Sequence, residues 1–380
     1  MGNDRGRIKE NAMPTFLHTA DIHLDSAFSA RFDARNAAQR RHELLRAVSQ
    51  MADIAKNLDI WLIAGDLFDG ANVSAETVAF LKRTFAEMPD TKVFISAGNH
   101  DVYSSNSVYA RENLGENVHV FSTTGECVEL EDIKTRVFGI SFGQQNCDRL
   151  STPKIEKKDG YYDIMLLHAD LVSNGGESAY NPIDKSFIEN CGADYLALGH
   201  IHKRSEPQRL GSTVYAYSGS PEGRGFDECG DMGCYIGRAC DGDTHVEFQS
   251  VCRRKMIITE VDLSDTEDNV GAVALARAAM TSQGGAEDIY RLILKGRVAN
   301  GVINPEILKE ELLRDVHYVE IKDETEPDYN FEELALRKDL CGEFVRTMQK
   351  KIELAADDEK SVLIQALKLG AEALLGGDRQ

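Results

Sequence analysis

Short apolar runs that stop at polar side chains recur between residues 14 and 220. Five of these runs, each four to six residues long, lie in the segments TFLHTADIH, DIWLIAGDLFD, KVFISAGNHD, YDIMLLHAD and ADYLALGHIH. Their length and their β-branched and aromatic residues predict buried strands. Helical periodicity lies between the early runs, at residues 35–57 and 74–88. This alternation of strands and helices predicts an α/β core.

Each of the five predicted strands ends in aspartate, asparagine or histidine. Because sites in α/β folds gather at the carboxyl ends of strands, we expect these side chains to converge. They are two carboxylates, one amide and four imidazoles: Asp21, His23, Asp66, Asn99, His168, His200 and His202. A single D-x-H or GD-x-x-D is common by chance, and a buried histidine is more often part of a hydrogen-bonded core. Five such accidents in one chain are improbable, so the set predicts a functional site.

The ordered motifs D-x-H, GD-x-x-D, GNHD, a strand-end histidine and GH-x-H resemble those of the calcineurin-like metallophosphoesterase superfamily, over about residues 14–225. The resemblance implies a four-layer α/β/β/α sandwich that holds two divalent metal ions. Carried over, the ligands of the first ion would be Asp21, His23, Asp66 and His202. Those of the second would be Asp66, Asn99, His168 and His200, with Asp66 bridging both ions. His100 would lie beside the substrate phosphate, and Asp101 would orient it.

The chemistry of such a site explains these residue types. Oxygen and imidazole ligands without cysteine suit Mn²⁺, Fe²⁺ or Zn²⁺, and we expect Mn²⁺ with the other two as alternatives. Two ions about 3.5–4 Å apart favour in-line attack on a phosphodiester by a metal-bridging hydroxide. The resemblance then makes His100 the acid that protonates the leaving alkoxide. We interpret Asp69 and Asp170 as groups that hold imidazoles in the correct tautomer.

Two segments narrow the substrate class. LHTADIHLDSAF and YAYSGSPEGRGFDECGDMG resemble parts of SbcD-type and YhaO-type DNA repair exonuclease subunits, with Met232 at the usual lysine. The resemblance implies a DNA exonuclease or endonuclease subunit with DNA as its partner. It also implies docking of an SbcC-like coiled-coil ATPase on the C-terminal helices. A small-molecule phosphodiesterase or phosphatase on the same core and a non-enzymatic assembly subunit stay open as alternatives.

Charge limits how DNA could be bound. The formal net charge is −20, which argues against a surface that binds nucleic acid everywhere. Phosphate contacts therefore need local basic groups. The candidate substrate-binding residues are Arg224 in the glycine-rich loop, and Lys203 and Arg204 after GH-x-H. The run Arg253-Arg254-Lys255 offers a further basic segment.

Composition shifts suggest four segments. Residues 1–13 are polar and read as a disordered tail, and 14–252 form the phosphoesterase domain. Residues 253–326 predict a β-α-β-α-β capping domain, and 327–380 predict helices whose apolar stripes pack as a hairpin or dock a partner. No apolar run approaches the roughly 20 residues of a membrane span. Because of that lack, we expect no membrane association. The eight cysteines form no C-x-x-C, so we expect reduced thiols and a cytoplasmic protein. The oligomeric state is left open, a homodimer included.

Overall fold

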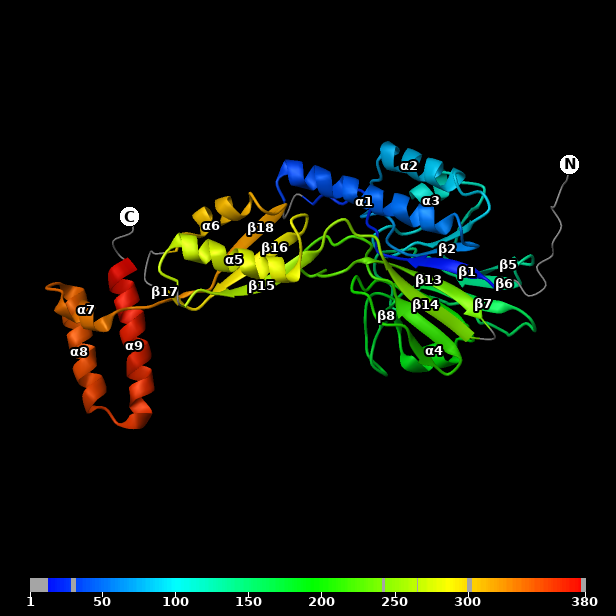
Figure 1. Cartoon of the computed structure of the whole chain (residues 1–380). Coiled ribbons are helices and arrows are strands. Elements are labelled where there is room, and N and C mark those ends of the chain that lie inside the picture. The colour runs from blue at the N-terminus through cyan, green and yellow to red at the C-terminus, as the bar shows by residue number, and fades with distance from the viewer. Residues whose placement is uncertain (1–12, 29–31, 241–242, 265, 299–302, 377–380) are drawn as a thin grey trace. The chain divides into compact units, whose positions relative to one another are not determined.

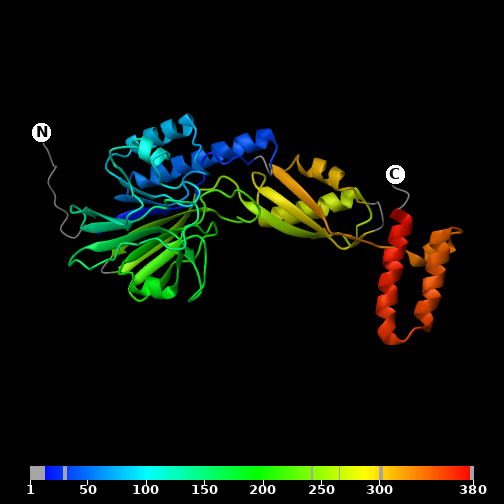
Figure 2. The same cartoon turned by 180° about the vertical axis from the view of Figure 1, so that it is seen from behind.

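The computed structural model describes residues 13–28, 32–240, 243–264, 266–298 and 303–376. The chain divides into two compact units, Met1–Ile257 and Ile258–Gln380, and each is described by itself (Figures 1 and 2). Except for Met13, the expected disordered tail at residues 1–13 lies outside the described residues. None of the helices in the described part of the chain has the length and apolar character that a membrane crossing requires.

The first sheet of the N-terminal unit has six strands. They are β1 (Thr15–Thr19), β2 (Ile60–Ala64), β3 (Lys92–Ser96), β4 (Val118–Val120), β13 (Gly233–Cys240) and β14 (Asp243–Ser250). Their order is β14-β13-β1-β2-β3-β4. The strands β1 to β4 are parallel, and the hairpin of β13 and β14 extends them in antiparallel fashion. The carboxyl ends of β1, β2 and β3 therefore lie at the same edge.

The second sheet also has six strands. They are β5 (Glu126–Leu130), β6 (Thr135–Gly139), β7 (Tyr162–His168), β10 (Tyr195–Gly199), β11 (Gln208–Leu210) and β12 (Thr213–Tyr217). Their order is β11-β12-β10-β7-β6-β5, with four parallel central strands and antiparallel edges. A small parallel pair, β8 (Asp170–Leu171) and β9 (Pro182–Ile183), lies beyond β7.

The two sheets pack face to face across one apolar core. Phe16, Leu62 and Phe94 of the first sheet share a cluster with Ile164 and Tyr195 of the second. Helices cover the outer faces: α1 (Ala34–Ala55), α2 (Ala75–Ala86) and α3 (Val108–Arg111) belong to the first side and α4 (Lys185–Asn190) to the second. Figure 1 shows α1 and α2 on one side of the strands and α4 on the other. The fold is thus the expected α/β/β/α sandwich.

The first turns of α1 and α2 follow ordinary capping chemistry. The Asp33 carboxylate accepts the backbone N–H of Asn36 at the start of α1, and the Ser74 hydroxyl does the same for Thr77 in α2. The ring of Phe85 in α2 packs edge-on against Trp61 of β2, with centroids 5.8 Å apart. The caps define where the two helices begin, and the Phe85–Trp61 contact packs α2 on the sheet whose strand ends carry the polar residues.

The second unit contains a smaller pair of one helical and one sheet layer, except for the first two residues of its first strand. Its elements are β15 (Met256–Asp262), α5 (Asn269–Gln283), β16 (Ile289–Lys295), α6 (Pro305–Leu312) and β18 (Tyr318–Asp323), with a short pair of β17 (Arg297–Val298) and β19 (Glu326–Pro327). The sheet order is β15-β16-β18, and the alternation of elements is the expected β-α-β-α-β. The segment boundaries at 252/253 and 326/327 stay proposals; the compact units meet between Ile257 and Ile258.

The C-terminal segment forms α7 (Phe331–Leu336), α8 (Leu340–Leu354) and α9 (Asp357–Gly376). Both views show α8 and α9 side by side (Figures 1 and 2). The apolar stripes pack against each other, because Cys341, Val345 and Met348 of α8 share a cluster with Leu367 of α9. Of the two alternatives for these stripes, the structure therefore shows packing as a helical hairpin. Other large apolar side chains of these helices stay exposed, among them Leu340, Leu354, Val362 and Leu369.

Candidate metal centre

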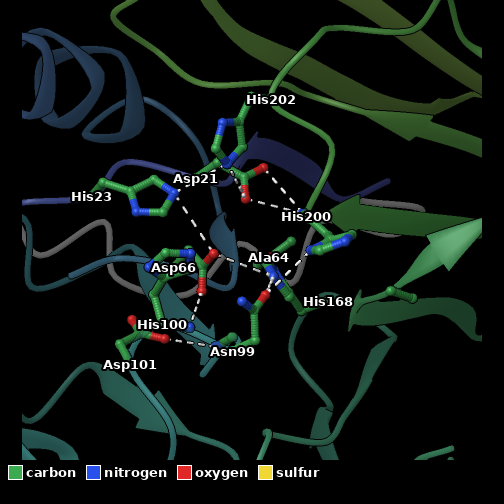
Figure 3. A network of polar contacts seen from close by, with 12 residues as sticks. Asp21, His23, Ala64, Asp66, Asn99, His100, Asp101, His168, His200 and His202 are labelled. Carbon is green, nitrogen blue, oxygen red and sulfur yellow. Dashed lines mark hydrogen bonds and ion pairs between the residues drawn. The ribbon is translucent and has the colours of Figure 1, made fainter. Parts of the chain in front are cut away.

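Seven polar side chains meet where the parallel strands of both sheets end (Figure 3). Asp21 and His23 follow β1, Asp66 follows β2, Asn99 follows β3, His168 ends β7, and His200 and His202 follow β10. The register places Gly199 directly beside His168, so the second sheet presents its histidines at one level. The structure therefore brings all seven sequence candidates to one place.

The backbone at these residues is unusual. Asp21, His23 and Asp66 have φ angles of 51°, 52° and 51°, and His200 has 103°. For residues with a Cβ this left-handed region is strained, and single residues of this kind cost on the order of 1–3 kcal/mol. Such residues cluster at functional sites, where the surrounding structure holds them in place.

Two glycines of the motifs allow the close approach that this geometry needs. A Cβ on Gly98, in GNHD, would lie 2.1 Å from Oδ1 of Asp66. A Cβ on Gly199, in GH-x-H, would lie 1.8 Å from the carbonyl oxygen of Ala64. Side chains at either position would push the strand ends apart. The glycines of these motifs therefore serve the packing of the site.

One group of ligand atoms comes from Asp21, His23, Asp66 and His202, whose donor atoms lie within 4.8 Å of one another. Nε2 of His23 is 3.6 Å from Oδ2 of Asp66 and 3.3 Å from Nε2 of His202. Nε2 of His202 is 4.0 Å from Oδ1 of Asp21. Imidazole nitrogens and carboxylate oxygens that point at a common centre form a donor set that fits a divalent cation.

A second group shares Asp66 with the first. Nε2 of His168 lies 2.9 Å from the Asn99 amide oxygen and 3.4 Å from Oδ2 of Asp66. Nδ1 of His200 lies 3.2 Å from the same amide oxygen. Nδ1 of His168 donates to the carbonyl of Ala64 at 2.9 Å, which holds the ring with Nε2 toward the oxygens. The two groups form one cluster able to hold metal.

Burial and mutual charge tune these groups. Burial alone would raise the pKa of Asp66, but the imidazoles of His168 and His23 outweigh it and hold this pKa well below its usual range. Burial lowers the pKa of His23 and of His200 to about 4, so both rings are neutral at pH 7. Burial also opposes protonation of His168, yet Asp66 raises its pKa to about 9. Neutral imidazole and ionised carboxylate are the forms that bind metal, and a bound cation would replace the proton on His168.

A family model described as calcineurin-like phosphoesterase matches residues 14–204, which is half of the chain. The chain belongs to the calcineurin-like phosphoesterase family. All seven side chains of the cluster lie within the matched residues. The chain is thus a phosphoester hydrolase by family, with a cluster able to hold metal.

Known proteins similar to this phosphoesterase include an uncharacterised metallophosphoesterase, YhaO, of Bacillus subtilis. It is 28% identical over 346 residues, which cover 84% of each chain. A DNA double-strand break repair protein Mre11 of Methanopyrus kandleri is 23% identical over 233 residues, 56% of this chain and 50% of that one. The Mre11 protein of Saccharolobus solfataricus is 21% identical over 377 residues, 94% of this chain and 95% of that one.

A carboxylate behind the cluster orients one imidazole of the phosphoesterase. Nδ1 of His23 donates to Oδ1 of Asp69 at 3.0 Å, and the Ser26 hydroxyl donates to the other oxygen at 2.9 Å. This is the tautomer-fixing contact expected for Asp69. Asp170 is not the partner of His168, whose Nδ1 donates to a backbone carbonyl. The charge of Asp170 acts on His200 instead, where it opposes the larger effect of burial, which lowers the pKa of that ring.

Glu228 is a functional candidate that the sequence analysis missed. Its carboxylate is buried, and Oε1 lies 2.7 Å from Nδ1 of His202. Burial would raise the pKa of Glu228, but the contacts with His202 and Arg224 outweigh burial and lower it. The available signal was an acidic residue inside the glycine-rich segment SGSPEGRGFDECG, four positions after Arg224.

His100 lies at the open side of the cluster, and 42% of its side chain is exposed. Its backbone N–H donates to Oδ1 of Asp66 at 2.9 Å, and its ring centroid is 4.8 Å from that of His23. Nδ1 of His100 is 3.5 Å from Oδ1 of Asp69. The imidazole is therefore adjacent to the cluster and open to a substrate.

The role expected for Asp101 needs correction. Its carboxylate is buried and accepts the backbone N–H groups of Gly98 and Phe68 and the hydroxyl of Tyr109, at 2.7, 3.1 and 2.5 Å. Burial raises its pKa to about 6. Asp101 thus holds the GNHD loop in shape, and Asp69 is the carboxylate beside the His100 ring.

Of the three predicted substrate-binding residues, the structure places Arg224 against the cluster, and Lys203 and Arg204 have other surroundings. Arg224 reaches the cluster, with Nη2 3.0 Å from Nδ1 of His202 and Nη1 3.4 Å from Oδ1 of Asp69. Lys203 is exposed. The guanidinium of Arg204 instead pairs with Glu206 at 2.9 Å and lies 4.2 Å from the ring centroid of Phe248.

The basic run before the second unit is also partly internal. The Arg254 side chain is buried, and its Nε donates to Oε1 of Glu43 at 2.7 Å. An arginine held this way contacts α1 and offers no charge to a phosphate. From the sequence alone, we expected this run to offer exposed basic groups for phosphate contacts.

Proposed function

We propose that the chain is a two-metal phosphodiesterase that acts on DNA. The observation that carries the proposal is the single cluster in which Asp66 is shared by two groups of nitrogen and oxygen ligands. One ion would be held by Asp21, His23, Asp66 and His202. The other would be held by Asp66, Asn99, His168 and His200. We propose Mn²⁺ as the native metal, with Fe²⁺ or Zn²⁺ as alternatives.

Two such ions, when bound, supply an activated water and stabilise the charge that develops on the phosphate. The protein residues then do three things. Asp69 and Glu228 hold the rings of His23 and His202 in orientation. The exposed imidazole of His100 would donate a proton to the leaving alkoxide, and its exposure beside the cluster supports this role. Arg224 provides a guanidinium at the rim, which suits an anionic oxygen.

DNA is the proposed substrate class because two of the relatives are named as DNA double-strand break repair proteins Mre11. The exposed apolar side chains of α8 and α9 are consistent with docking of a coiled-coil ATPase, which would contribute DNA affinity. A small phosphoester remains the second candidate. It is favoured by the net charge of −20 and by the pairing of Arg204 and Arg254 with glutamates.

The test is cleavage of end-labelled single-stranded and duplex DNA by the purified chain with Mn²⁺, Fe²⁺ or Zn²⁺, beside a panel of nucleotides and an aryl phosphodiester. An Asp66→Asn variant controls for contaminating nucleases. We expect metal-dependent DNA cleavage that the variant lacks. Faster turnover of a small physiological ester than of any DNA would favour the second candidate. Absence of DNA cleavage, alone or with a cognate ATPase, would refute the proposal.

A further inference from the structure

The glycine-rich loop at residues 218–228 supports one side of the cluster. The backbone N–H of Ser220 donates to the carbonyl of His202 at 3.0 Å. At the other end of the loop, Glu228 contacts Nδ1 of His202 at 2.7 Å and accepts the backbone N–H of Arg224 at 2.7 Å. The position of the His202 ring therefore depends on the position of this loop.

The loop is tied to α1 by a buried arginine. Arg40 has 0% exposure, and its Nη2 lies 2.9 Å from Oε1 of Glu222 and 2.5 Å from the carbonyl oxygen of Gly223. Glu222 is also fully buried, and its other oxygen accepts the backbone N–H of Arg253 at 2.7 Å. Arg40 thus reaches the residue immediately before Arg224.

Four charged side chains form this buried ion cluster, namely Arg40, Glu43, Glu222 and Arg254. Two guanidinium groups and two carboxylates give it a formal charge of zero. Burying ions costs desolvation energy that their attraction does not fully return, so such a cluster is weak evidence for stability alone. The cluster instead fixes the relative positions of its side chains, because a guanidinium group pairs with a carboxylate in only a few geometries.

We propose that Arg40 and Glu222 are positioning residues for the metal centre. Their buried pair fixes the loop at Gly223, the next residues carry Arg224 and Glu228, and Glu228 orients His202. The inference rests on the proposed function in that it takes His202 as a metal ligand. Arg40 and Glu222 are 182 positions apart in the sequence. A substitution at either residue should weaken binding of the ion on the His202 side and leave binding of the other ion unchanged.

The variants Glu222→Gln and Arg40→Lys test this with little change in volume. Glutamine keeps the oxygen near Arg40 but removes the charge, and lysine keeps the charge but loses the fork. Mn²⁺ binding is measured by equilibrium dialysis, with free Mn²⁺ quantified by electron paramagnetic resonance. We expect one of two ions to bind roughly tenfold more weakly, as is typical when support behind a ligand is lost. Glu228→Gln should weaken the same ion, and its effect should not add to that of Glu222→Gln.

Asp163→Asn is the matched control. Asp163 is fully buried and forms a two-pronged pair with Arg136, at 2.8 and 3.1 Å. It lies at the start of β7, whose far end is His168. This variant should lower the melting temperature as the test variants do, yet bind Mn²⁺ like the wild type.

The outcomes separate the two proposals. Wild-type protein that binds no Mn²⁺ would refute the metal centre itself. Wild-type protein that binds two ions, together with folded Glu222→Gln and Arg40→Lys variants that bind both unchanged, would refute only the positioning role. Equal losses of Mn²⁺ affinity in Asp163→Asn and the test variants would also refute it, because general destabilisation would then explain the effect.

Discussion

Asp69 offers a graded test of how support behind the metal centre works. One oxygen accepts Nδ1–H of His23 at 3.0 Å and lies 3.5 Å from Nδ1 of His100 and 3.4 Å from Nη1 of Arg224. The other accepts the Ser26 hydroxyl at 2.9 Å. A single carboxylate therefore contacts a proposed ligand, the proposed acid and the proposed phosphate-binding group.

Asp69→Asn removes the charge and leaves an oxygen where His23 needs an acceptor, whereas Asp69→Ala removes both. A charged hydrogen bond is roughly twice as strong as a neutral one. The asparagine variant should therefore lose on the order of 1 kcal/mol of the hydrogen-bond energy that holds the His23 ring in orientation. That corresponds to about fivefold weaker Mn²⁺ binding. Loss of the whole support typically costs about 10- to 100-fold in metal affinity, which is the range expected for the alanine variant.

The assay is Mn²⁺ titration by calorimetry, followed by hydrolysis of an aryl phosphodiester at saturating Mn²⁺. Asp25→Ala is the control, because Asp25 accepts from Ser74 and Thr77 at the start of α2. It should change melting temperature but not Mn²⁺ affinity. Equal affinities in the asparagine and alanine variants, or wild-type affinity in both, would refute the reasoning that Asp69 orients His23.

Three other changes test separate parts of the molecule. His100→Ala should retain both metal ions in elemental analysis but lose about 10²- to 10⁴-fold in rate; a wild-type rate on an ester with a poor leaving group would contradict the acid role. Asp66→Asn should lose metal as well as activity because both ligand groups share this carboxylate, and retention of two ions would contradict the shared ligand. His18 is fully buried between the sheets, and burial lowers its pKa to about 3. This folded-state pKa lies below the unfolded value of 6.5. The contribution of the neutral His18 ring to the free energy of unfolding is therefore fully present above pH 6.5, and it falls by roughly 1.4 kcal/mol for each pH unit below that. His18→Gln should reduce this loss between pH 6.5 and 4.5 in urea unfolding, and parallel pH curves would argue against it.

The α/β core and the convergence of its strand ends follow from local sequence, whereas the four-layer sandwich was expected from the family resemblance. Parallel strands place their carboxyl ends at one edge, so polar residues after β1, β2 and β3 had to meet once those runs were recognised as strands. The pairing of β7 with β10 did the same for His168 and His200. Apolar periodicity also predicted the helices α8 and α9 but left hairpin packing and partner docking as alternatives, and the structure shows the hairpin packing.

Side-chain direction was harder to predict because tertiary packing decides it. Asp101 follows His100 in sequence, yet its carboxylate turns to Tyr109 and backbone groups. Arg254 lies in an apparently exposed basic run, yet α1 supplies Glu43 to bury it. Glu228 lies inside the glycine-rich segment rather than at a strand end, and only the fold brings it to His202.

The left-handed backbone at Asp21, His23, Asp66 and His200 has a consequence for engineering. Glycine adopts this conformation without steric cost, so glycine at any of these positions would relieve strain in the folded state. The same substitution removes a proposed ligand. Glycine would also remove the side chain's buried contacts, such as the bond from the His100 N–H to Asp66. Wherever relief of strain outweighs that loss, a selection for thermal stability alone would discard a proposed ligand, whereas a selection that also requires metal binding would keep the strain.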